Sequence, residues 1–453
     1  MSPTVALSMI MRNAAADLPN CLASVRGVAD EIVIADTGST DGSIAIARQH
    51  GARVIAIPWD NDFAAARNAA LAECRADWIL SLDADQRLDP AAGPILRGLM
   101  ANQSGPLGYQ ASIRNYVLSA RVHMYAAAAK PNDHRIEEAR PYPAYVEHEN
   151  ALFFRRRPEI YFVGRVHETT ARCIEQLCGQ VGPPCFIVHH FTFTENPETR
   201  RRKDVLYREL GRQKLAERPD DPRSYLELGA EELEHFGNAA EALQLFARAC
   251  QIAPTFWLAW YYQGLAQLRL GRPREALAAF ASAREGGLGG AYFEAAAGEA
   301  SYALGEFAAA GHCFRRALKG QPDSATFASQ LALCEIRGGD AEAGLKRLRR
   351  AQRAEPDNVE VHDRLVTALA WLGQAKAAAE AAELWLARSP ASHPQPYMRA
   401  ASLRAHEQQW PEAARLIQQG LDRFPADPGL QAAWSEVQPH LAHALSQKPR
   451  PPV

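Results

Sequence analysis

Five glycines recur at a constant interval of 34 residues, and this spacing constrains the fold more than any other feature of the chain. They are Gly237, Gly271, Gly305, Gly339 and Gly373. Prolines keep the same register at Pro254, Pro322, Pro356 and Pro390, with Pro425 one residue late. Such a fixed period indicates stacked copies of one small unit. The second half of the chain is therefore expected to be an array of paired antiparallel helices.

A second set of positions repeats in the same register and is small. It comprises Ala242, Ala276, Ala310, Gly344, Ala378 and, one residue late, Ala413. Large apolar residues follow at Phe246, Phe280 and Phe314. A 34-residue period with a short side chain where two helices approach is that of tetratricopeptide repeats, and it predicts about six repeats over residues 223–425. Four aromatics are expected either on the concave face or in the core: Trp257, Trp260, Tyr261 and Tyr262.

The first 90 residues follow a different pattern, in which short apolar runs alternate with helical stretches. Strands are expected at residues 5–10, 31–35, 53–57 and 78–81, with helices at 18–25, 43–50 and 64–74. This alternation predicts a mostly parallel sheet covered by helices. Open sheets of this kind bind their ligands at the carboxyl ends of the strands.

Two acidic sequences follow expected strands. Asp83 and Asp85, separated by the small Ala84, can approach one divalent ion and leave positions for phosphate oxygens. The alternative is a turn with local hydrogen bonds. Asp36 opens the loop to Gly42 and is placed to accept from a base N–H or a ribose hydroxyl. Residues 39–41 of that loop are also suited to cap the next helix.

Three sequence blocks in this region resemble the nucleotide-binding half of family 2 glycosyltransferases, which have the GT-A fold. They are EIVIADTGSTDGS, WDNDFAAARNAAL and ADWILSLDADQRL, in the family's order within residues 4–90. The resemblance implies that Asp36 contacts the nucleoside, that Arg67 borders the nucleotide, that Asp83 lies near ribose or metal, and that Asp85 binds the metal. It also implies a nucleotide-sugar donor, UDP-linked, with Mn²⁺ or Mg²⁺. Guanidinium is well shaped for phosphate, which supports the role of Arg67.

The chain departs from its apparent relatives at two points. Relatives often have Asn-Glu where this chain has Asn13-Ala14, and often a fourth acidic residue where it has Gln86. The first departure weakens the nucleoside contact expected near Asn13. The second leaves the pair of metal-binding carboxylates intact.

Further strands are expected at residues 109–118, 144–154 and 160–166, and the last runs into Gly164-Arg165-Val166-His167-Glu168. The resemblance implies that Glu168 is the base that an inverting transferase needs on the acceptor side. The alternative is a structural ion pair of Glu168 with Arg165 or Arg172. His167 is expected either to bind acceptor or phosphate, or to fill a polar core position.

A late histidine completes the expected site. His190-Phe191 follows the apolar run at residues 186–188, and the resemblance implies that His190 is a third metal ligand beside the carboxylate pair, a role that suits imidazole. The alternative is a hydrogen-bonded structural histidine at a strand end.

Composition excludes several classes of function. The net charge of −2 over 453 residues argues against a nucleic-acid partner. The sequence shows no signal peptide and no transmembrane segment of 18 apolar residues, so a cytoplasmic protein is expected. Eight cysteines occur without a Cys-x-x-Cys pair, and reduced thiols are favoured over a zinc site formed by Cys173, Cys178 and Cys185.

These observations predict an α/β GT-A domain at residues 1–204, an all-α tetratricopeptide-repeat superhelix at 205–440 and a disordered tail at 441–453. The expected function is inverting, metal-dependent transfer of a sugar to a peptide or protein acceptor, with possible homo-oligomerisation through the repeats. One alternative acceptor is a lipopolysaccharide or capsule glycan. The other alternative is a protein-binding scaffold with a degenerate nucleotide-binding domain.

Overall fold

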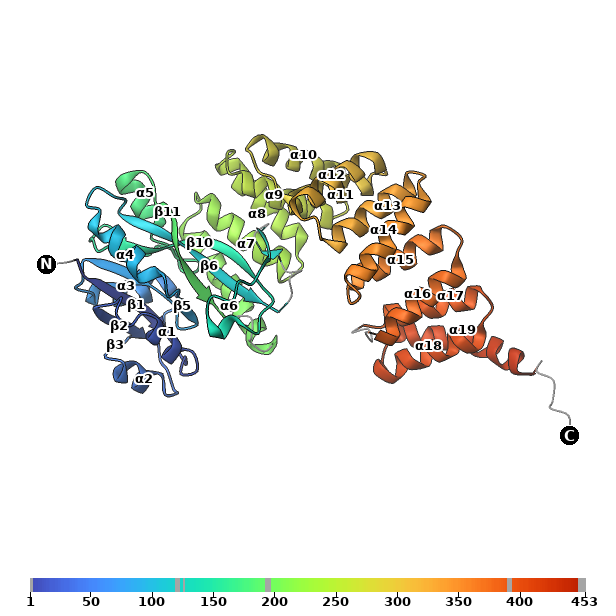
Figure 1. Ribbon diagram of the computed structural model, residues 1–453, viewed down its shortest axis with the longest axis horizontal. Coiled ribbons are helices and arrows are strands. Elements are labelled where there is room, and N and C mark those ends of the chain that lie inside the picture. The colour runs from blue at the N-terminus through green and yellow to red at the C-terminus, as the bar shows by residue number, and fades with distance from the viewer. Residues whose placement is uncertain (1–2, 119–122, 125–126, 192–196, 389–392, 447–453) are drawn as a thin grey trace. The chain divides into compact units, whose positions relative to one another are not determined.

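The computed structural model describes residues 3–118, 123–124, 127–191, 197–388 and 393–446. The chain forms two units, Met1–Ala266 and Gln267–Val453. Unit 1 contains the whole sheet and the first repeat helices, and unit 2 contains the later repeats (Figure 1).

Unit 1 is organised around a mixed sheet with the strand order β3-β2-β1-β4-β10-β6-β11-β5. The strands are β1 (Val5–Met11), β2 (Glu31–Asp36), β3 (Arg53–Ala56), β4 (Trp78–Ser81), β5 (Gln86–Leu88), β6 (Gly108–Val117), β10 (Ala144–Arg155) and β11 (Gly182–His190). Three short strands complete the set: β7 (His123–Met124), β8 (Ala127–Ala128), which pairs with β7, and β9 (Lys130–Pro131), which pairs with β10. The helices between them are α1 (Leu18–Ser24), α2 (Ser43–Gln49), α3 (Phe63–Glu73), α4 (Ala92–Ala101) and α5 (Ala171–Cys178).

The first four strands are parallel, as the alternating pattern predicts: β1 pairs with β2 and β4, and β2 pairs with β3. Side chains from these strands alternate between two hydrophobic clusters. Leu7, Ile34 and Leu80 belong to one cluster. Ala6, Val33 and Ile79 belong to the other. Both faces of the sheet are therefore buried, which explains why these strands are short and almost wholly apolar.

The prediction of a strand at residues 160–166 is wrong. This segment joins no sheet and forms only an isolated bridge between Val163 and Thr169. Instead, the side chain of Asn68 makes two hydrogen bonds to the backbone of Phe162. It accepts the Phe162 N–H at 2.8 Å and donates to the Phe162 carbonyl at 2.9 Å. Gly164 then turns the chain with φ +106°, so the run cannot continue as a strand.

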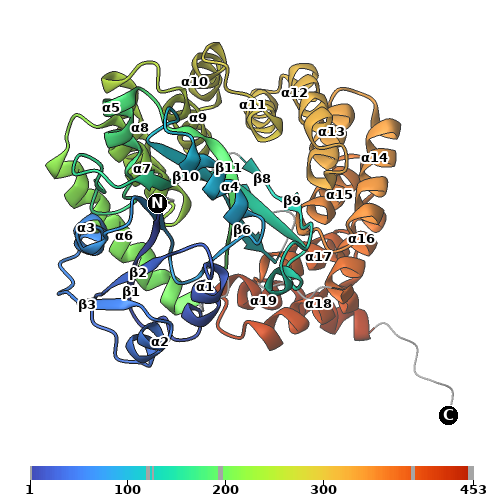
Figure 2. The same ribbon diagram turned by 60° about the vertical axis from the view of Figure 1, so that its left-hand side comes forward.

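The repeats form six helix pairs in the described residues from 222 to 423, as the 34-residue period predicts, and a last helix follows them (Figure 2). The pairs are α7 (Pro222–Glu234) with α8 (Ala239–Ile252), α9 (Trp257–Arg269) with α10 (Pro273–Glu285), α11 (Ala291–Ala303) with α12 (Phe307–Gly320), α13 (Ala325–Arg337) with α14 (Ala341–Ala354), α15 (Val359–Trp371) with α16 (Ala375–Arg388), and α17 (Gln395–His406) with α18 (Trp410–Arg423). The helices that flank them are α6 (Pro197–Glu217) and α19 (Pro428–Ser446).

The repeating residues have the expected physical roles. The five periodic glycines all lie in the turn within a pair, with φ between +66° and +102°, a conformation that costs glycine little. The small position is buried in every pair, and at Gly344 an added Cβ would lie 2.5 Å from Ile336 Cγ1. Tyr261 and Tyr262 are buried and therefore belong to the core.

Two expected limits fall inside helices. The limit between residues 204 and 205 lies within α6, which is continuous from Pro197 to Glu217. The helix α19 continues to Ser446, so the first residues of the expected tail are helical rather than disordered. Leu441 still packs against the repeat core there, and residues 447–453 lie outside the described residues. No helix in the described residues is long and apolar enough to cross a membrane.

Candidate active site

The carboxylates predicted from the sequence lie at one edge of the sheet. Asp36 is the last residue of β2, and Asp83 follows β4 by two positions. The strand β1 separates them and runs parallel to both, with Met11 opposite Asp36 and Ser8 opposite Ser81. This is the carboxyl edge, where open α/β sheets bind ligands.

Asp36 is held by its own loop, yet one of its oxygens is left without a partner. The side chain is 3 % exposed, and Oδ2 accepts the backbone N–H groups of Gly38 at 3.1 Å and Ser39 at 3.0 Å. Its Oδ1 is buried and has no hydrogen-bond partner. Asn13 fixes the same loop by accepting the Thr40 N–H at 2.7 Å. A buried orphan acceptor is costly, and a ligand N–H or O–H would relieve that cost.

The Asp83–Asp85 turn is shaped by the two residues that follow it. Gln86 accepts the Asp83 N–H through Oε1 at 3.1 Å. The buried guanidinium of Arg87 donates to the carbonyls of Ala84 and Gln86, each at 3.0 Å. Gln86 therefore has a structural role at the position where relatives often carry an acidic residue, and the two aspartates are held on a fixed turn.

His190 lies beside Asp85 because β11 pairs with β5 in a register that sets His190 opposite Gln86. Its Nε2 is 3.5 Å from Asp85 Oδ2, and its Nδ1 is 2.8 Å from Asn115 Oδ1. Burial alone would lower the pKa of His190, but the Asp85 carboxylate outweighs it and the pKa is raised. Asp85 Oδ1 is buried without a partner. An orphan carboxylate oxygen beside an imidazole nitrogen fits a divalent metal ion, so these two residues suit the expected metal.

Arg67, on α3, joins two of the predicted site residues. It donates through Nη2 to Asp83 Oδ1 at 2.7 Å and through Nε to Glu168 Oε1. The side chains of Arg67 and Glu168 are each 11 % exposed. Burial opposes the positive charge, yet the two carboxylates raise the pKa of Arg67 further above its ordinary value. The guanidinium thus orients the expected base relative to the acidic turn.

Glu168 does not pair with either of the arginines considered as structural partners. Arg165 pairs with Glu217 at 2.6 Å, and Arg172 lies 3.8 Å from Asp221. These two ion pairs connect the segment around Glu168 to α6 and to the start of α7. The alternative prediction of an ion pair with Arg165 or Arg172 is therefore wrong, because the Glu168 carboxylate pairs with Arg67 instead.

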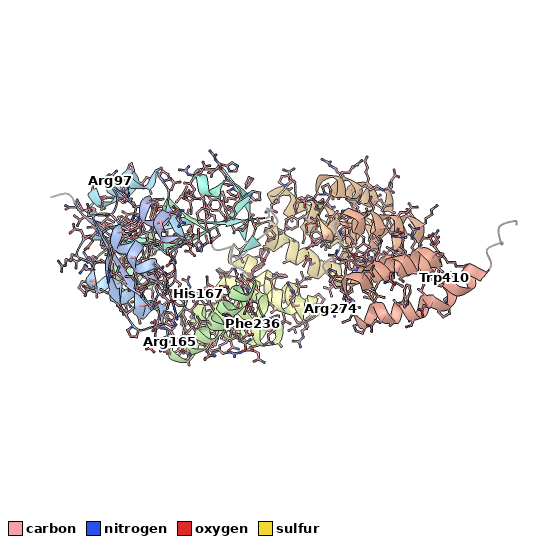
Figure 3. The ribbon with its side chains drawn as sticks, turned by 90° about the horizontal axis from the view of Figure 1, so that it is seen from below. Arg97, Arg165, His167, Phe236, Arg274 and Trp410 are labelled. Atoms are coloured by element: carbon pink, nitrogen blue, oxygen red, sulfur yellow. The ribbon has the colours of Figure 1, made fainter. Side chains whose placement is uncertain are left out.

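His167 is turned toward the first repeat helices, where Figure 3 labels it together with Phe236 near the end of α7. Its Nε2 is 4.0 Å from Glu231 Oε1, and its ring meets Tyr207 edge-on at a centroid distance of 5.8 Å. The residue has φ +50°, a backbone value that is uncommon for residues other than glycine. The structure therefore brings together Asp83, Arg67 and Glu168, and separately Asp85 and His190, while the His167 ring faces α6 and α7.

His189 and the cysteines do not form a zinc site in the described residues. His189 is fully buried and bonded to Tyr116 Oη at 2.8 Å and to Asp89 Oδ2 at 3.1 Å. Cys173 donates to the Tyr161 carbonyl at 3.4 Å, and Cys185 lies 4.0 Å from the Gln110 carbonyl. Cys173 and Cys185 have free thiols, and the side chain of Cys178 lies outside the described residues.

Three residues contribute to the site without having been predicted. Asn115 on β6 contacts His190 and also His148 on β10, with Asn115 Nδ2 and His148 Nδ1 2.7 Å apart. Burial, helped by the nearby His190, lowers the pKa of His148 to about 4. The positive charge of Lys203 on α6 acts with His190 to lower the pKa of Asp85 in spite of its burial. Polar residues inside the expected strands 109–118 and 144–154 were the available signal for Asn115 and His148.

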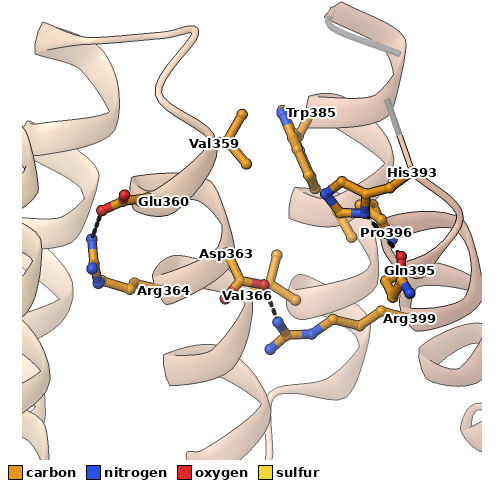
Figure 4. A pocket seen from close by; sticks show the side chains of 11 residues that line it. Val359, Glu360, Asp363, Arg364, Val366, Trp385, His393, Gln395, Pro396 and Arg399 are labelled. Carbon is orange, nitrogen blue, oxygen red and sulfur yellow. Dashed lines mark hydrogen bonds and ion pairs between the residues drawn. The ribbon is translucent and has the colours of Figure 1, made fainter. Parts of the chain in front are cut away.

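Unit 2 holds a separate cavity of about 420 Å³ among the helices α15, α16 and α17. Figure 4 shows its charged rim, in which Arg364 bonds Glu360 and Arg399 bonds Asp363, opposite the ring of Trp385. The lining of the cavity combines apolar and charged side chains.

Comparison with known proteins agrees with this architecture. Residues 7–156 match the family model Glycosyl transferase family 2. An uncharacterized glycosyltransferase of Rickettsia felis is 36 % identical over 22 % of this chain and 36 % of its own length. The lipopolysaccharide core biosynthesis glycosyltransferase LpsC of Rhizobium meliloti is 34 % identical over 26 % of this chain and 46 % of its own length. A TPR repeat-containing protein of Synechococcus elongatus is 51 % identical over 18 % of this chain and 21 % of its own length.

The fold and the repeats thus define an α/β GT-A domain followed by an all-α tetratricopeptide-repeat region. The N-terminal domain is similar to glycosyltransferase family 2 over residues 7–156. The chain spans less than half the length of each of these relatives.

Proposed function

We propose that the protein is an inverting, metal-dependent glycosyltransferase that moves a sugar from a nucleotide-sugar donor, UDP-linked, to a peptide or protein acceptor. The observation that carries this proposal is the pair of buried carboxylate oxygens without partners, Asp36 Oδ1 and Asp85 Oδ1, at the carboxyl edge of the sheet. Structural carboxylates normally have their oxygens satisfied, so two orphans at one ligand-binding edge point to a polar ligand and a cation.

Each residue of the edge has a definite task in this proposal. Asp36 would accept a hydrogen bond from the nucleoside, and Asp83 would contact the ribose or the metal. Asp85 and His190 would hold Mn²⁺ or Mg²⁺, which when bound offsets the charge that develops on the departing diphosphate. Lys203 adds positive charge near the same position.

Glu168 acts as the base on the acceptor side. Its carboxylate takes the proton of the acceptor nucleophile as the new glycosidic bond forms, while the bond to the diphosphate breaks on the opposite face of the sugar. Arg67 keeps Glu168 in place through its Nε and keeps Asp83 in place through Nη2, so one guanidinium sets the spacing between the donor side and the base.

The proposed acceptor is a polypeptide, because stacked repeats present a long surface on which a chain can lie. The cavity among α15, α16 and α17 supports this proposal, because its lining offers both apolar and charged groups to a polypeptide. A glycan acceptor is the second candidate, and it is favoured by the similarity to a lipopolysaccharide core glycosyltransferase. The repeats are also proposed to join two copies of the chain. The free thiols of the described cysteines suit a reducing, cytoplasmic setting.

The donor and the acceptor are tested separately. A panel of sugar nucleotides is incubated with the full chain and Mn²⁺, and slow donor hydrolysis identifies the donor. No hydrolysis or binding of any donor would favour the scaffold alternative. Transfer is then measured to peptide and to lipopolysaccharide core acceptors, with Arg399→Ala in the cavity and Arg349→Ala as an exposed control on α14. A polypeptide acceptor predicts reduced transfer for Arg399→Ala alone, with donor hydrolysis unchanged.

A further inference from the structure

We propose that Asp204, Glu231 and His235 form a second metal site, selective for a transition ion of the Zn²⁺ type, where α6 meets α7. One oxygen or nitrogen ligand atom from each of the three lies within 4.8 Å of the other two, the one such group among the described residues. The site is distinct from the Asp85–His190 pair, and its existence does not depend on the proposed transferase activity.

The two helices place these groups together through their pairing. Ion pairs show that α6 and α7 run antiparallel: Lys214 contacts Glu227, Arg208 contacts Glu232, and Asp204 Oδ2 lies 3.7 Å from His235 Nδ1. Glu231 and His235 are four residues apart and therefore share one face of the helix. The last turn of α7 remains intact, since the His235 N–H donates to the Glu231 carbonyl at 3.0 Å.

The burial of Glu231 is a second, independent indication of a cation site. Its side chain is 14 % exposed, and its Oε2 is fully buried without a hydrogen-bond partner. Burial raises the pKa of Glu231; Asp204 and Glu234 raise it further, while His235 and His167 oppose them. A carboxylate in such a position is costly unless a cation compensates it.

Of the neighbouring arginines, one pairs with a proposed ligand through its other oxygen, and two compensate different acids. Arg200 lies 3.4 Å from Asp204 Oδ1. Arg208 and Arg212 approach Glu232 at 3.5 and 3.0 Å, and Arg212 also reaches Glu241. Asp204 Oδ2, Glu231 and His235 thus meet between α6 and α7 and combine carboxylates with imidazole, which is the donor set of a metal site.

The chemistry of the donors selects the ion. Carboxylate oxygen and imidazole nitrogen together suit Zn²⁺, whose tetrahedral shell at about 2.0–2.1 Å leaves neighbouring ligand atoms about 3.4 Å apart. The 3.7 Å between Asp204 and His235 is already close to that separation. His167 Nε2 lies 4.0 Å from Glu231 Oε1 but is not a member of the group, so water would complete the shell of the ion.

The proposed ion would connect the first repeat pair to the segment that carries the expected base. Lys214 Nζ already holds this segment by donating to the Val166 carbonyl at 2.9 Å. A metal bound by α6 and α7 would hold together the two helices against which the His167 ring lies, one residue before Glu168. This consequence for catalysis rests on the proposed function, whereas metal binding itself does not.

The test measures Zn²⁺ binding to the full chain in the Asp85→Asn background, which removes the first expected site. Chelator-treated protein is titrated with Zn²⁺ against a chromophoric competitor, and Co²⁺ is used in parallel to detect tetrahedral coordination by its visible absorption. One equivalent is expected to bind. Glu231→Gln and His235→Asn should each weaken binding by at least about 100-fold, more than the loss caused by removing an outer-shell partner, and should abolish the Co²⁺ band.

The control is Glu234→Gln, which removes an exposed carboxylate that acts on Glu231 only through its charge, and it should weaken binding by no more than a few-fold. Circular dichroism establishes that each variant is helical before titration. The proposal is overturned if the Asp85→Asn protein binds no Zn²⁺, or if Glu231→Gln and His235→Asn bind it as tightly as Glu234→Gln. Failure of donor turnover with normal binding would instead count against the proposed function alone.

Discussion

The repeat helices and the candidate active site differ in what their buried residues contribute. In the repeats, small residues such as Ala276 and Ala310 are fully buried where helices meet, and the turns use glycine at positive φ. At the carboxyl edge of the sheet, Asp36 and Asp85 each bury an oxygen that has no partner. The small repeat positions serve close packing, whereas the unpaired oxygens of the edge lie where open α/β sheets bind ligands. Glu231 on α7, at the proposed second metal site, buries an unpaired oxygen of the same kind.

This contrast predicts different consequences of substitution in the two regions. A change at the edge should remove chemistry and leave the fold intact, because the altered group does not contribute to packing. A change at a small repeat position should disturb packing and leave the donor site intact.

The largest effect is expected for Asp85→Ala. Donor turnover should fall by more than about 10³-fold, because the charge stabilisation supplied by a bound metal is worth several kcal/mol. Mn²⁺-dependent UDP binding should weaken in parallel, as measured by calorimetry. Asp323→Ala, which removes an exposed carboxylate from a repeat turn, is the control. Unchanged Mn²⁺-dependent UDP binding in folded Asp85→Ala protein would remove the metal assignment.

Glu168→Gln should have the next largest effect. It keeps the size of the side chain and a hydrogen bond to Arg67 but cannot take up a proton, so transfer should fall by about 10²-fold or more. Donor affinity should change little. Glu159→Gln, at an exposed position earlier in the same segment, should behave like the parent chain. Near-normal transfer by Glu168→Gln would assign the base to another residue.

A third change tests the repeat side of the comparison. In Gly344→Val the added Cβ would lie 2.5 Å from Ile336 Cγ1 and 2.6 Å from the Ala332 carbonyl. Overpacking of this kind should destabilise the surrounding repeats by about 1–3 kcal/mol. Denaturant unfolding of unit 2 should report the loss, while UDP binding stays constant. Gly289→Ala, whose Cβ would meet no atom within 4 Å, is the matched control.

The sequence was sufficient for the elements that repeat or alternate. The spacing of Gly237, Gly271 and their successors requires a turn at positive φ every 34 residues, and the structure has one at each. The expected strand at 160–166 failed because a distant side chain, Asn68, competes for its backbone groups. No local pattern reveals such a partner, since Asn68 and Phe162 are 94 residues apart.

The same reason limited prediction of the candidate site. Asp83 and Asp85 could be predicted because both lie on one turn after one strand. Asn115 and His148 could not, because their relation to His190 depends on β6 lying between β10 and β11 in the sheet. The arrangement of His167 against Glu231 likewise depends on how α7 packs, which periodicity does not specify.

The smallest effect is expected from His148 and concerns pH. Burial lowers its pKa in the folded chain to about 4, below the ordinary value of about 6.5 in the unfolded chain. Between these two pKa values the unfolded state therefore binds more protons than the folded state. As the pH falls from 7 to 5, protonation of His148 in the unfolded chain lowers the free energy of unfolding by about 2 kcal/mol. In His148→Asn the side chain does not titrate, so the loss of stability on acidification should shrink by that amount. Denaturant unfolding of parent and variant at the two pH values measures the difference. An equal loss in both would show that His148 is solvated and protonates freely, and the neutral imidazole assigned beside Asn115 would then be wrong.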